Sequence, residues 1–505
     1  MTGLLKFLAF ALILAASGPA DPGLQGPIVL AGGGSEGDIG DTSAWSYPLY
    51  GRLLQRGDVT GNGIVSVAVL AASDQTEWLP LYFEWIGTTL GLRVDARNFI
   101  VRNRTEADSP DVADGIGRAD AIFIKGGDQG VYYDTWNGTL LETAIRAASL
   151  RGAAIGGTSA GAMALSEYCL SGSRDLISSD VMSDAFTPYL NDASDPGTSG
   201  IHADFLSLLR DIAVDTHFTQ RGRLGRLAGI LAKATEDAVR PKTALLGIGI
   251  DEQTGIAVAD GVAEIIGRGA VTFLRASDAT RLDRRPGCPL VYTDLLLDRL
   301  LQGERFDLNA RRARPAIESP PRSPAGLGAG GVSGPGWEAR MILIDGGRTV
   351  NSDLFEYTVS RQLMIPGLIR TTSPQFVPGT VGFTDTGSSS NRAPAQQAFL
   401  AALSERPDLL AVLGFQGGGL LYLPSPSRRF LFSGSSAWII ADVNPRSSLD
   451  GAGWTGSAAR GSTRLHILAS LGPGLSVFDL DRRTIEEFHR PAGRDLKRGR
   501  ETAGS

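Results

Sequence analysis

Short apolar runs that alternate with helix-forming stretches constrain the fold of this chain most. Four runs rich in Ile, Val, Leu and Ala are typical of buried strands: residues 28–30, 64–71, 121–124 and 153–155. Between them, residues 78–91 and 140–150 carry apolar side chains at helical spacing. Strands that are apolar throughout indicate a mostly parallel sheet with helices on both faces. The sequence therefore predicts an α/β fold, with ligand sites at the carboxyl ends of the strands.

A Pro- and Gly-rich stretch divides the chain. Its 505 residues exceed one ordinary core, so two folded units are expected. Residues 313–336 have the composition of a linker. We expect it to join a first domain at 21–312 to a second C-terminal domain at 337–489, either α/β or β-rich. Residues 490–505 are polar and basic and are predicted to be a disordered tail.

The first twenty residues have the pattern of a secretory signal peptide. Lys6 precedes an apolar run at residues 7–16, and small residues at 15–20 suit cleavage. The run has about half the length that a bilayer span needs. We therefore expect the protein to be exported, to the periplasm or outside the cell, without a stable membrane anchor.

Composition excludes several classes of function. A formal net charge of −6 gives no general attraction for nucleic acid. With two cysteines, four histidines and neither an HExxH nor a CxxC motif, neither a catalytic metal nor a cofactor is expected. Cys169 and Cys288 could pair in an oxidising compartment, but a free, buried Cys169 is an equal expectation.

A serine stands at a predicted strand-to-helix turn. Residues 155–164 contain Gly157-x-Ser159-x-Gly161, the nucleophile-elbow pattern. A serine held at such a sharp turn has strained dihedral angles, so its neighbours must be small. The Ala160 N–H would face the oxyanion that develops when Ser159 attacks a carbonyl. Ser159 is therefore the candidate nucleophile, and an ordinary glycine-rich turn is the alternative interpretation.

One histidine is well placed to act as the base. His217 follows an apolar run at 212–214, at the edge of the sheet where sites form. Glu252 and its neighbour Asp251 follow the next predicted strand, at 245–250. Either carboxylate could orient the histidine, and position in the sequence leaves both open.

Further candidates surround these residues. Gly127, which follows the predicted strand at 121–124, could supply the second oxyanion N–H because glycine permits a close approach. Three arginines follow the candidate base: Arg221, Arg223 and Arg226. A solvated start of a helix is their ordinary explanation. Beside a catalytic histidine, they indicate capture of a substrate rich in carboxylates.

Four motifs together resemble those of cyanophycinases, and they occur in that family's order. They are Gly-Gly-Asp-Gln at 126–129, Gly-Gly-Thr-Ser-Ala-Gly-Ala at 156–162, Asp-x-His-Phe-x-Gln-Arg-Gly-Arg-Leu-Gly-Arg-Leu at 215–227 and Gly-Ile-Asp-Glu at 249–252. The resemblance covers residues 27–310. It implies a flavodoxin-like sheet of the class I glutamine-amidotransferase type, a homodimer, and Ser159, His217 and Glu252 as nucleophile, base and orienting acid. It also implies a substrate pocket lined by Gln129, Asp215, Thr216, Arg221, Arg223 and Arg226.

The implied substrate is cyanophycin, a poly-aspartate backbone with arginine on each side chain, or a related Asp-rich peptide. Thr216 departs from the family pattern, because glutamine is expected between the Asp and the His. Two other functions stay open: an isoaspartyl or aspartyl dipeptidase, and a noncatalytic exported binding protein on the same scaffold. Residues 32–37 match a dinucleotide-binding fingerprint, but only in isolation. An ordinary α/β-hydrolase would need His466 or His489 as its base, and neither stands in a motif.

The C-terminal half contains a weak repeat of the first. Residues 411–415 resemble residues 244–248. This alignment places Gly419 opposite Glu252. Gly387 likewise stands opposite His217. No counterpart of the Ser159 turn is present. We therefore expect the C-terminal domain to be a degenerate, noncatalytic partial repeat.

Overall fold

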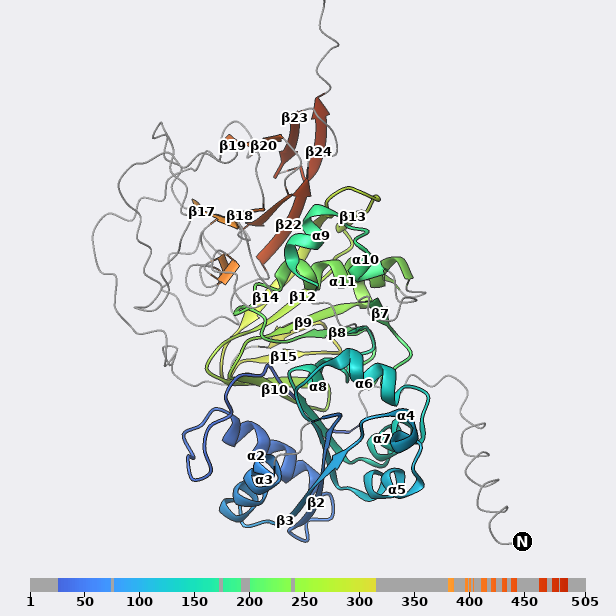
Figure 1. Ribbon diagram of the computed structural model, residues 1–505. Coiled ribbons are helices and arrows are strands. Elements are labelled where there is room, and N and C mark those ends of the chain that lie inside the picture. Colours follow the sequence, from blue (N-terminus) through green and yellow to red (C-terminus); the bar gives the residue numbers. More distant parts are fainter. Residues whose placement is uncertain are drawn as a thin grey trace, which may run out of the picture.

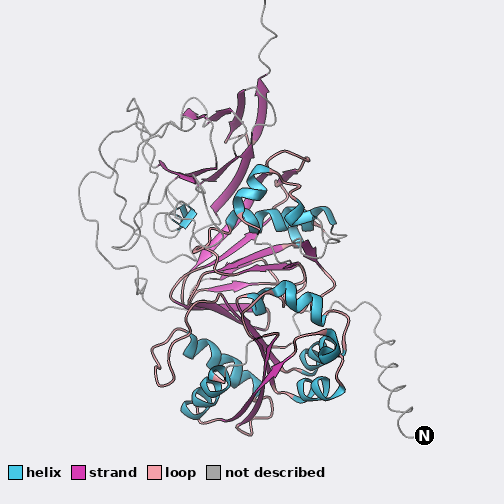
Figure 2. Ribbon diagram, in the orientation of Figure 1, coloured by secondary structure: helices cyan, strands magenta, loops and turns pink. Residues whose placement is uncertain are grey.

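The molecule, seen here in a computed structural model, has helix-covered strands at one end and mainly strands at the other (Figure 1). The structure describes residues 26–73, 77–171, 176–191, 200–237, 241–314, 380–385, 396–397, 399–400, 403, 410–415, 419–423, 429–433, 437–442, 463–469, 475–480 and 482–488. Figure 2 shows that most of the helices lie in the lower part and around the middle of the molecule. The predicted signal peptide and basic tail, and all but the first two residues of the predicted linker, lie outside the described residues.

Parallel strands form one half of the first sheet. In spatial order they are β3 (Arg93–Ile100), β2 (Ile64–Ala71), β4 (Ala121–Ile124), β5 (Ala154–Thr158) and β1 (Ile28–Ala31). The four predicted apolar runs are all strands, which confirms the α/β fold. The edge strand β3 was not predicted, because its side chains are largely polar and only Ala96 is buried.

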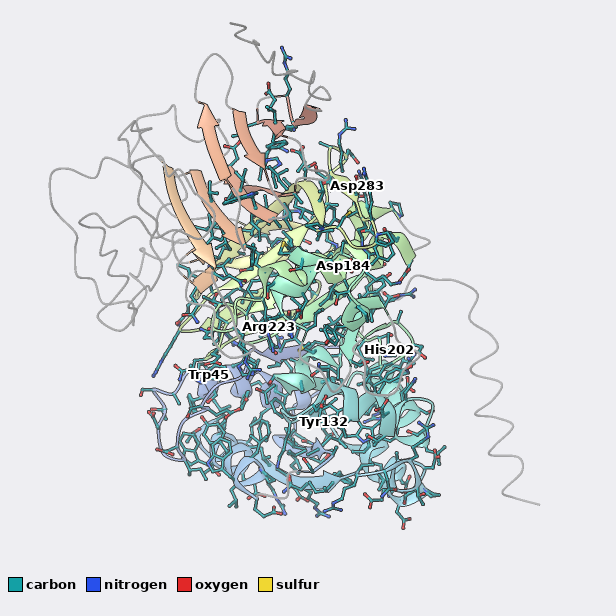
Figure 3. The ribbon with its side chains drawn as sticks, turned by 45° about the horizontal axis from the view of Figure 1, so that its top comes forward. Trp45, Tyr132, Asp184, His202, Arg223 and Asp283 are labelled. Carbon is teal, nitrogen blue, oxygen red and sulfur yellow. The ribbon has the colours of Figure 1, made fainter. Side chains whose placement is uncertain are left out.

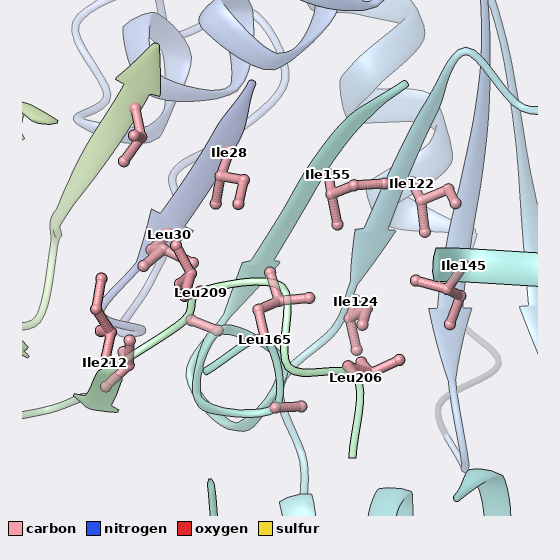
Figure 4. Packing of buried hydrophobic residues seen from close by; sticks show 14 of the residues in the cluster. Ile28, Leu30, Ile122, Ile124, Ile145, Ile155, Leu165, Leu206, Leu209 and Ile212 are labelled. Carbon is pink, nitrogen blue, oxygen red and sulfur yellow. The ribbon is translucent and has the colours of Figure 1, made fainter. Parts of the chain in front are cut away.

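Helices cover both faces of these strands, and alternate residues of each strand face opposite layers. On β1, Val29 packs with α2 (Ser46–Gly57) and α3 (Trp78–Thr89). The neighbouring Ile28 packs on the other face with α5 (Pro110–Arg118) and α7 (Leu140–Arg151). Figure 4 shows this second layer, where Ile28, Ile155 and Ile122 lie along one face of the sheet. Three further helices belong to this part of the chain: α4 (Arg104–Ala107), α6 (Gln129–Trp136) and α8 (Ala160–Met163).

Antiparallel strands extend the sheet beyond β1. They are β10 (Thr254–Ala259), β11 (Val262–Gly267), β15 (Arg305–Asp307) and β16 (Arg312–Arg314). β1 therefore lies between β5, which runs parallel to it, and β10, which runs antiparallel. This pairing brings the segment that precedes β10, with Glu252, to the carboxyl end of β1.

The second sheet joins the two halves of the chain. Its order is β17 (Thr380–Asp385), β18 (Leu410–Phe415), β21 (Ala437–Asp442), β22 (Thr463–Ala469), β14 (Val291–Leu300), β12 (Val271–Arg275), β9 (Leu246–Ile250) and β8 (Ile212–Asp215). β13 (Arg281–Asp283) also pairs with β14. The antiparallel pairing of β14 with β22 carries the sheet from one half into the other. One hydrophobic cluster likewise contains residues of both, such as Leu227 and Ile439.

The strand order of this sheet is symmetric about the β14–β22 pair. β8 is parallel to β9, and β9, β12 and β14 follow antiparallel. β17, β18, β21 and β22 repeat that pattern. A separate sheet of β19 (Gly419–Leu423), β20 (Arg429–Ser433), β23 (Leu475–Asp479) and β24 (Thr484–Phe488) has the order of β10, β11, β15 and β16. The expected match of Gly419, the first residue of β19, to Glu252 stays a prediction.

Smaller elements complete the region around β8 and β9. The helix α11 (Leu224–Asp237) connects these two strands and ends before the short helix η1 (Lys242–Ala244). Two short helices, α9 (Ser178–Ser183) and α10 (Pro188–Asn191), pack against α11. β6 (Cys169–Ser171) pairs with β7 (Gly200–His202).

Candidate active site

Ser159 lies at the turn from β5 into α8, in a strained backbone conformation. Its φ of 53° and ψ of −120° are rare for a residue with a β-carbon. The turn is possible because its neighbours are glycines. A β-carbon on Gly157 would lie 2.5 Å from the carbonyl carbon of Gly161, and one on Gly161 would lie 2.6 Å from the carbonyl oxygen of Lys125. The small residues of the motif are therefore required by close packing around the turn.

The His217 imidazole connects Ser159 to a carboxylate. The Ser159 Oγ lies 2.8 Å from Nε2 of His217, and Nδ1 of His217 lies 2.7 Å from Oε1 of Glu252. Because a carboxylate only accepts, Nδ1 donates to Glu252, which leaves Nε2 to accept from the serine hydroxyl. These three side chains come from the ends of different segments: the turn after β5, the loop after β8 and the loop after β9.

Asp251, the other carboxylate considered for this position, has different partners. It is buried, and its Oδ2 accepts a hydrogen bond from Arg299 at 2.8 Å. Its Oδ1 accepts from the backbone N–H of Thr219 at 3.0 Å. Asp251 therefore holds the loop that follows His217 against β14, and Glu252 is the carboxylate in contact with the imidazole.

The glycine run after β1 makes room for this arrangement. A β-carbon on Gly33 would lie 2.6 Å from Nε2 of His217, and one on Gly34 would lie 3.2 Å from the Cβ of Glu252. The His217 N–H donates to the carbonyl oxygen of Gly32 at 2.9 Å. The sequence offered these glycines only as an isolated dinucleotide motif. Their contact with the histidine was missed, because it joins the segment after β1 to the loop after β8, which lie far apart in the sequence.

Two backbone segments lie beside Ser159. Ala160 is the first residue of α8 and follows the serine directly. The loop after β4 approaches from the other side, since a β-carbon on Gly126 would lie 3.3 Å from the Cβ of Ser159. Gly127 is exposed in this loop and has a φ of +154°, which favours glycine. Asp128 fixes the loop by accepting a hydrogen bond from the Gly130 N–H at 2.8 Å.

Burial and charge set the protonation states of the histidine and its carboxylate. Burial holds the pKa of His217 below its ordinary value of 6.5. The hydrogen bond to Glu252 acts in the opposite direction, whereas the charges of Arg221 and Arg223 lower that pKa further. The hydrogen bond from His217 is the largest cause of the lowered pKa of Glu252. Near neutral pH the site therefore holds a neutral imidazole beside an ionised carboxylate.

Four of the six predicted pocket residues are buried. Asp215 is completely buried and pairs with Arg226, whose Nε donates to its Oδ2 at 2.8 Å. Arg223 is also buried and lies 3.3 Å from Oδ1 of Asp215. Thr216 is buried beside them. Asp215, Arg223 and Arg226 thus form a buried ion-pair network beside Thr216, and the prediction that these four side chains line a substrate pocket stays a prediction. Figure 3 labels Arg223 near the middle of its view, between Asp184 and Trp45.

Gln129 and Arg221, the other two predicted pocket residues, remain accessible. Both are partly exposed. Gln129 begins α6 beside the loop of Gly127, and Arg221 is close enough to His217 and Glu252 to lower the pKa of both. Arg221 has no ion pair among the described residues, in contrast to Arg223. Its guanidinium is thus available for an incoming carboxylate.

Other groups add no chemistry to the site. Cys169 and Cys288 are both free, and burial raises the pKa of the Cys169 thiol to about 12. In the part of the chain that the structure describes, no three or more His, Cys, Asp or Glu side chains are grouped as metal ligands. No described helix has the length and apolar character to cross a membrane.

The fold and this contact define an α/β protein with a serine, a histidine and a glutamate in hydrogen-bonding succession. Residues 88–266 match the sequence model of peptidase family S51. The chain is 29% identical over 226 residues to the cyanophycinase of Trichormus variabilis, which covers 43% of this chain and 66% of that relative's length. It is 28% identical over 256 residues to the cyanophycinase of Synechococcus elongatus, covering 50% of this chain and 72% of the relative.

These matches confirm the resemblance to cyanophycinases predicted from the motifs, and they place the similarity to peptidase family S51 in residues 88–266. A solved peptidase from an acI-B1 actinobacterium is also similar, with a TM-score of 0.36 and 20% identity over 56% of this chain and 97% of that one. The matched part of the chain holds Ser159, His217 and Glu252.

Proposed function

We propose that the chain is a serine-type peptidase that hydrolyses cyanophycin or a related Asp-rich peptide. The observation that carries this proposal is the continuous contact from Ser159 through His217 to Glu252, at 2.8 Å and 2.7 Å. Its setting at a strained strand-to-helix turn is that of an activated nucleophile. The matches to peptidase family S51 and to cyanophycinases support the same activity.

The reaction proceeds by acyl transfer. His217 Nε2 takes the hydroxyl proton as the Ser159 oxygen attacks the scissile carbonyl, and Glu252 stabilises the imidazolium that forms. The N–H groups of Gly127 and Ala160 hold the oxyanion. His217 then gives its proton to the leaving amine, and the acyl-enzyme forms. Water, deprotonated by the same imidazole, attacks the ester and releases the acid product together with free Ser159.

Substrate polarity follows from the accessible groups of the site. Arg221 is partly exposed beside His217 and offers a fork of donors to a carboxylate of an Asp-rich chain. Gln129 offers an amide at the start of α6, on the side of the Gly127 loop. The buried Asp215 and Arg226 take no direct part in this recognition. Specificity therefore depends on Arg221 and Gln129 more than on Thr216, which is buried.

An isoaspartyl or aspartyl dipeptidase is a second candidate, because the same serine, histidine and glutamate would serve it and Arg221 would bind its carboxylates as well. A noncatalytic binding protein needs no strained serine in contact with a histidine, so the strain at Ser159 argues against it.

We further propose export from the cell, on the basis of the N-terminal pattern of Lys6 and residues 7–16. The homodimer implied by the family resemblance also remains a proposal.

The proposal is tested by incubating the purified chain with cyanophycin, and separately with isoaspartyl and aspartyl dipeptides. Release of Asp-Arg dipeptides from cyanophycin is expected, and Ser159→Ala should abolish it while the circular dichroism spectrum stays unchanged. Cleavage of the dipeptides alone would assign the second activity. Undiminished hydrolysis by Ser159→Ala would reject Ser159 as nucleophile.

A further inference from the structure

A residue of the C-terminal half reaches the loop that holds the catalytic histidine. The Nε2 of Gln397 donates a hydrogen bond to the backbone carbonyl oxygen of Gln220 at 2.6 Å. Gln220 lies three residues after His217, in a turn closed by a hydrogen bond from the Arg221 N–H to the His217 carbonyl oxygen at 2.9 Å. Gln397 thus holds a turn whose first residue is the proposed base.

The contact continues to the backbone of Glu252. The side-chain Oε1 of Gln220 accepts a hydrogen bond from the backbone N–H of Glu252 at 2.9 Å. Gln220 is therefore bound through its backbone to Gln397 and through its side chain to Glu252. Because the two ends of this bridge meet the segments of Glu252 and His217, its position affects the distance between the carboxylate and Nδ1.

Gln397 is itself held by the core. Neighbouring residues Phe399, Leu400 and Leu403 are buried in the hydrophobic cluster that also contains Leu224 and Leu227 of α11. The pairing of β14 with β22 ties the same half of the chain to the sheet of β8 and β9. Gln397 therefore projects from a packed segment, which is the condition for positioning a partner accurately.

We propose that Gln397 is a positioning residue of the site, so that the C-terminal half belongs to the catalytic unit and completes the loop of His217 and Glu252. This inference rests on the proposed peptidase function. It deepens it, since the family match ends at residue 266 and the residue that steadies the proposed base lies beyond it. The C-terminal repeat, which lacks the Ser159 turn, then has a defined part in activity.

The test uses the full chain with Gln397→Met, which keeps most of the side-chain volume but has no hydrogen to donate. Gln55→Met, at an exposed position of α2, is the matched control. Two readouts are compared: hydrolysis of cyanophycin, and the rate at which a fluorophosphonate probe labels Ser159. The probe reports the activated serine whatever the natural peptide is.

For Gln397→Met we expect kcat and the labelling rate to fall about 10-fold, because small displacements of a catalytic pair are costly. The acid limb of the pH profile should move to lower pH, since a looser hydrogen bond to Glu252 supports the imidazolium less. Gln220→Met should have a similar effect, and the double variant should lose little more than either single one. Gln55→Met should behave as the parent chain.

Two results would overturn the inference. One is an active parent chain whose Gln397→Met variant has the same kcat, labelling rate and pH profile. The other is a loss of activity with an unmoved acid limb and additive single variants, because that pattern belongs to a general loss of folded protein. A parent chain that neither cleaves the peptides nor reacts with the probe would instead remove the proposed function, and the inference with it.

Discussion

Gly33 and His217 are packed so closely that any side chain at position 33 would occupy the place of the imidazole. A β-carbon there would lie 2.6 Å from Nε2, the atom that faces Ser159. The glycine also has a φ of +88°, which a residue with a side chain adopts only with strain. The glycine run after β1 therefore shapes the side of the histidine that faces Ser159, although it carries no reactive group.

Gly33→Ala is expected to displace the imidazole and to lower kcat by about 100-fold, since misplacing a catalytic group by about 1 Å has effects of this size. The matched control is Gly40→Ala. Gly40 also has a positive φ, of +100°, but no atom lies within 4 Å of a β-carbon there. Both variants share the backbone strain, so steady-state kinetics of the pair isolate the contact with His217. Equal kcat values for the two variants would contradict the steric explanation.

The adjacent carboxylates Glu252 and Asp251 should respond to mutation in different ways. Glu252→Gln removes the charge beside His217 and should lower kcat by about 10³-fold or more with a small change in stability. Asp251→Asn instead leaves Arg299 without its buried partner and should cost about 3–5 kcal/mol of unfolding free energy. Urea unfolding and single-turnover kinetics of both variants check this division. It would be refuted if Asp251→Asn reduced kcat while its unfolding free energy stayed that of the parent.

The sequence predicted the residues of this site better than it predicted their surroundings. Ser159 and His217 could be predicted because a strained turn and the ends of apolar strands leave local patterns, whereas Glu252 was implied only by the resemblance to cyanophycinases. Asp251 could not be separated from Glu252 by position, since adjacent residues in a loop point in different directions only once β9, β12 and β14 are paired. The burial of Asp215, the last residue of β8, could not be predicted either, because it depends on the packing of α11 against β8.

The antiparallel strands of the chain illustrate the same limit. β10 and β11 were not predicted from the sequence. β10 nevertheless pairs with β1 and so brings Glu252 to the site. The hydrogen bond from Gln397 to Gln220 spans 177 residues of sequence. No local pattern encodes such a contact, which depends on the sheet that joins the two halves.

The pH dependence of activity should follow the His217 pKa. Burial lowers this pKa below 6.5, and the reaction needs the neutral imidazole. The kcat/KM should therefore be retained as pH falls through 6.5 and be lost only at lower pH, as His217 becomes protonated. Arg221→Gln removes a positive charge that lowers this pKa, so the acid limb should move to higher pH. A profile of kcat/KM from pH 4 to 9 would measure both effects, and an acid limb above 6.5 in the parent chain would contradict the assignment.

The ion pairs of Asp215 should contribute more to the stability of the fold than to substrate binding. Asp215→Asn leaves the buried guanidinium groups of Arg226 and Arg223 without their carboxylate, and the expected loss is about 3–5 kcal/mol of unfolding free energy. Asp283→Asn is the matched control, because its ion pair with Arg285 is partly exposed and should contribute less than about 1 kcal/mol. Equilibrium unfolding in urea compares the two. If Asp215→Asn instead raised KM and left the unfolding free energy unchanged, Asp215 would belong to the substrate pocket, and the interior placement of this network would be wrong.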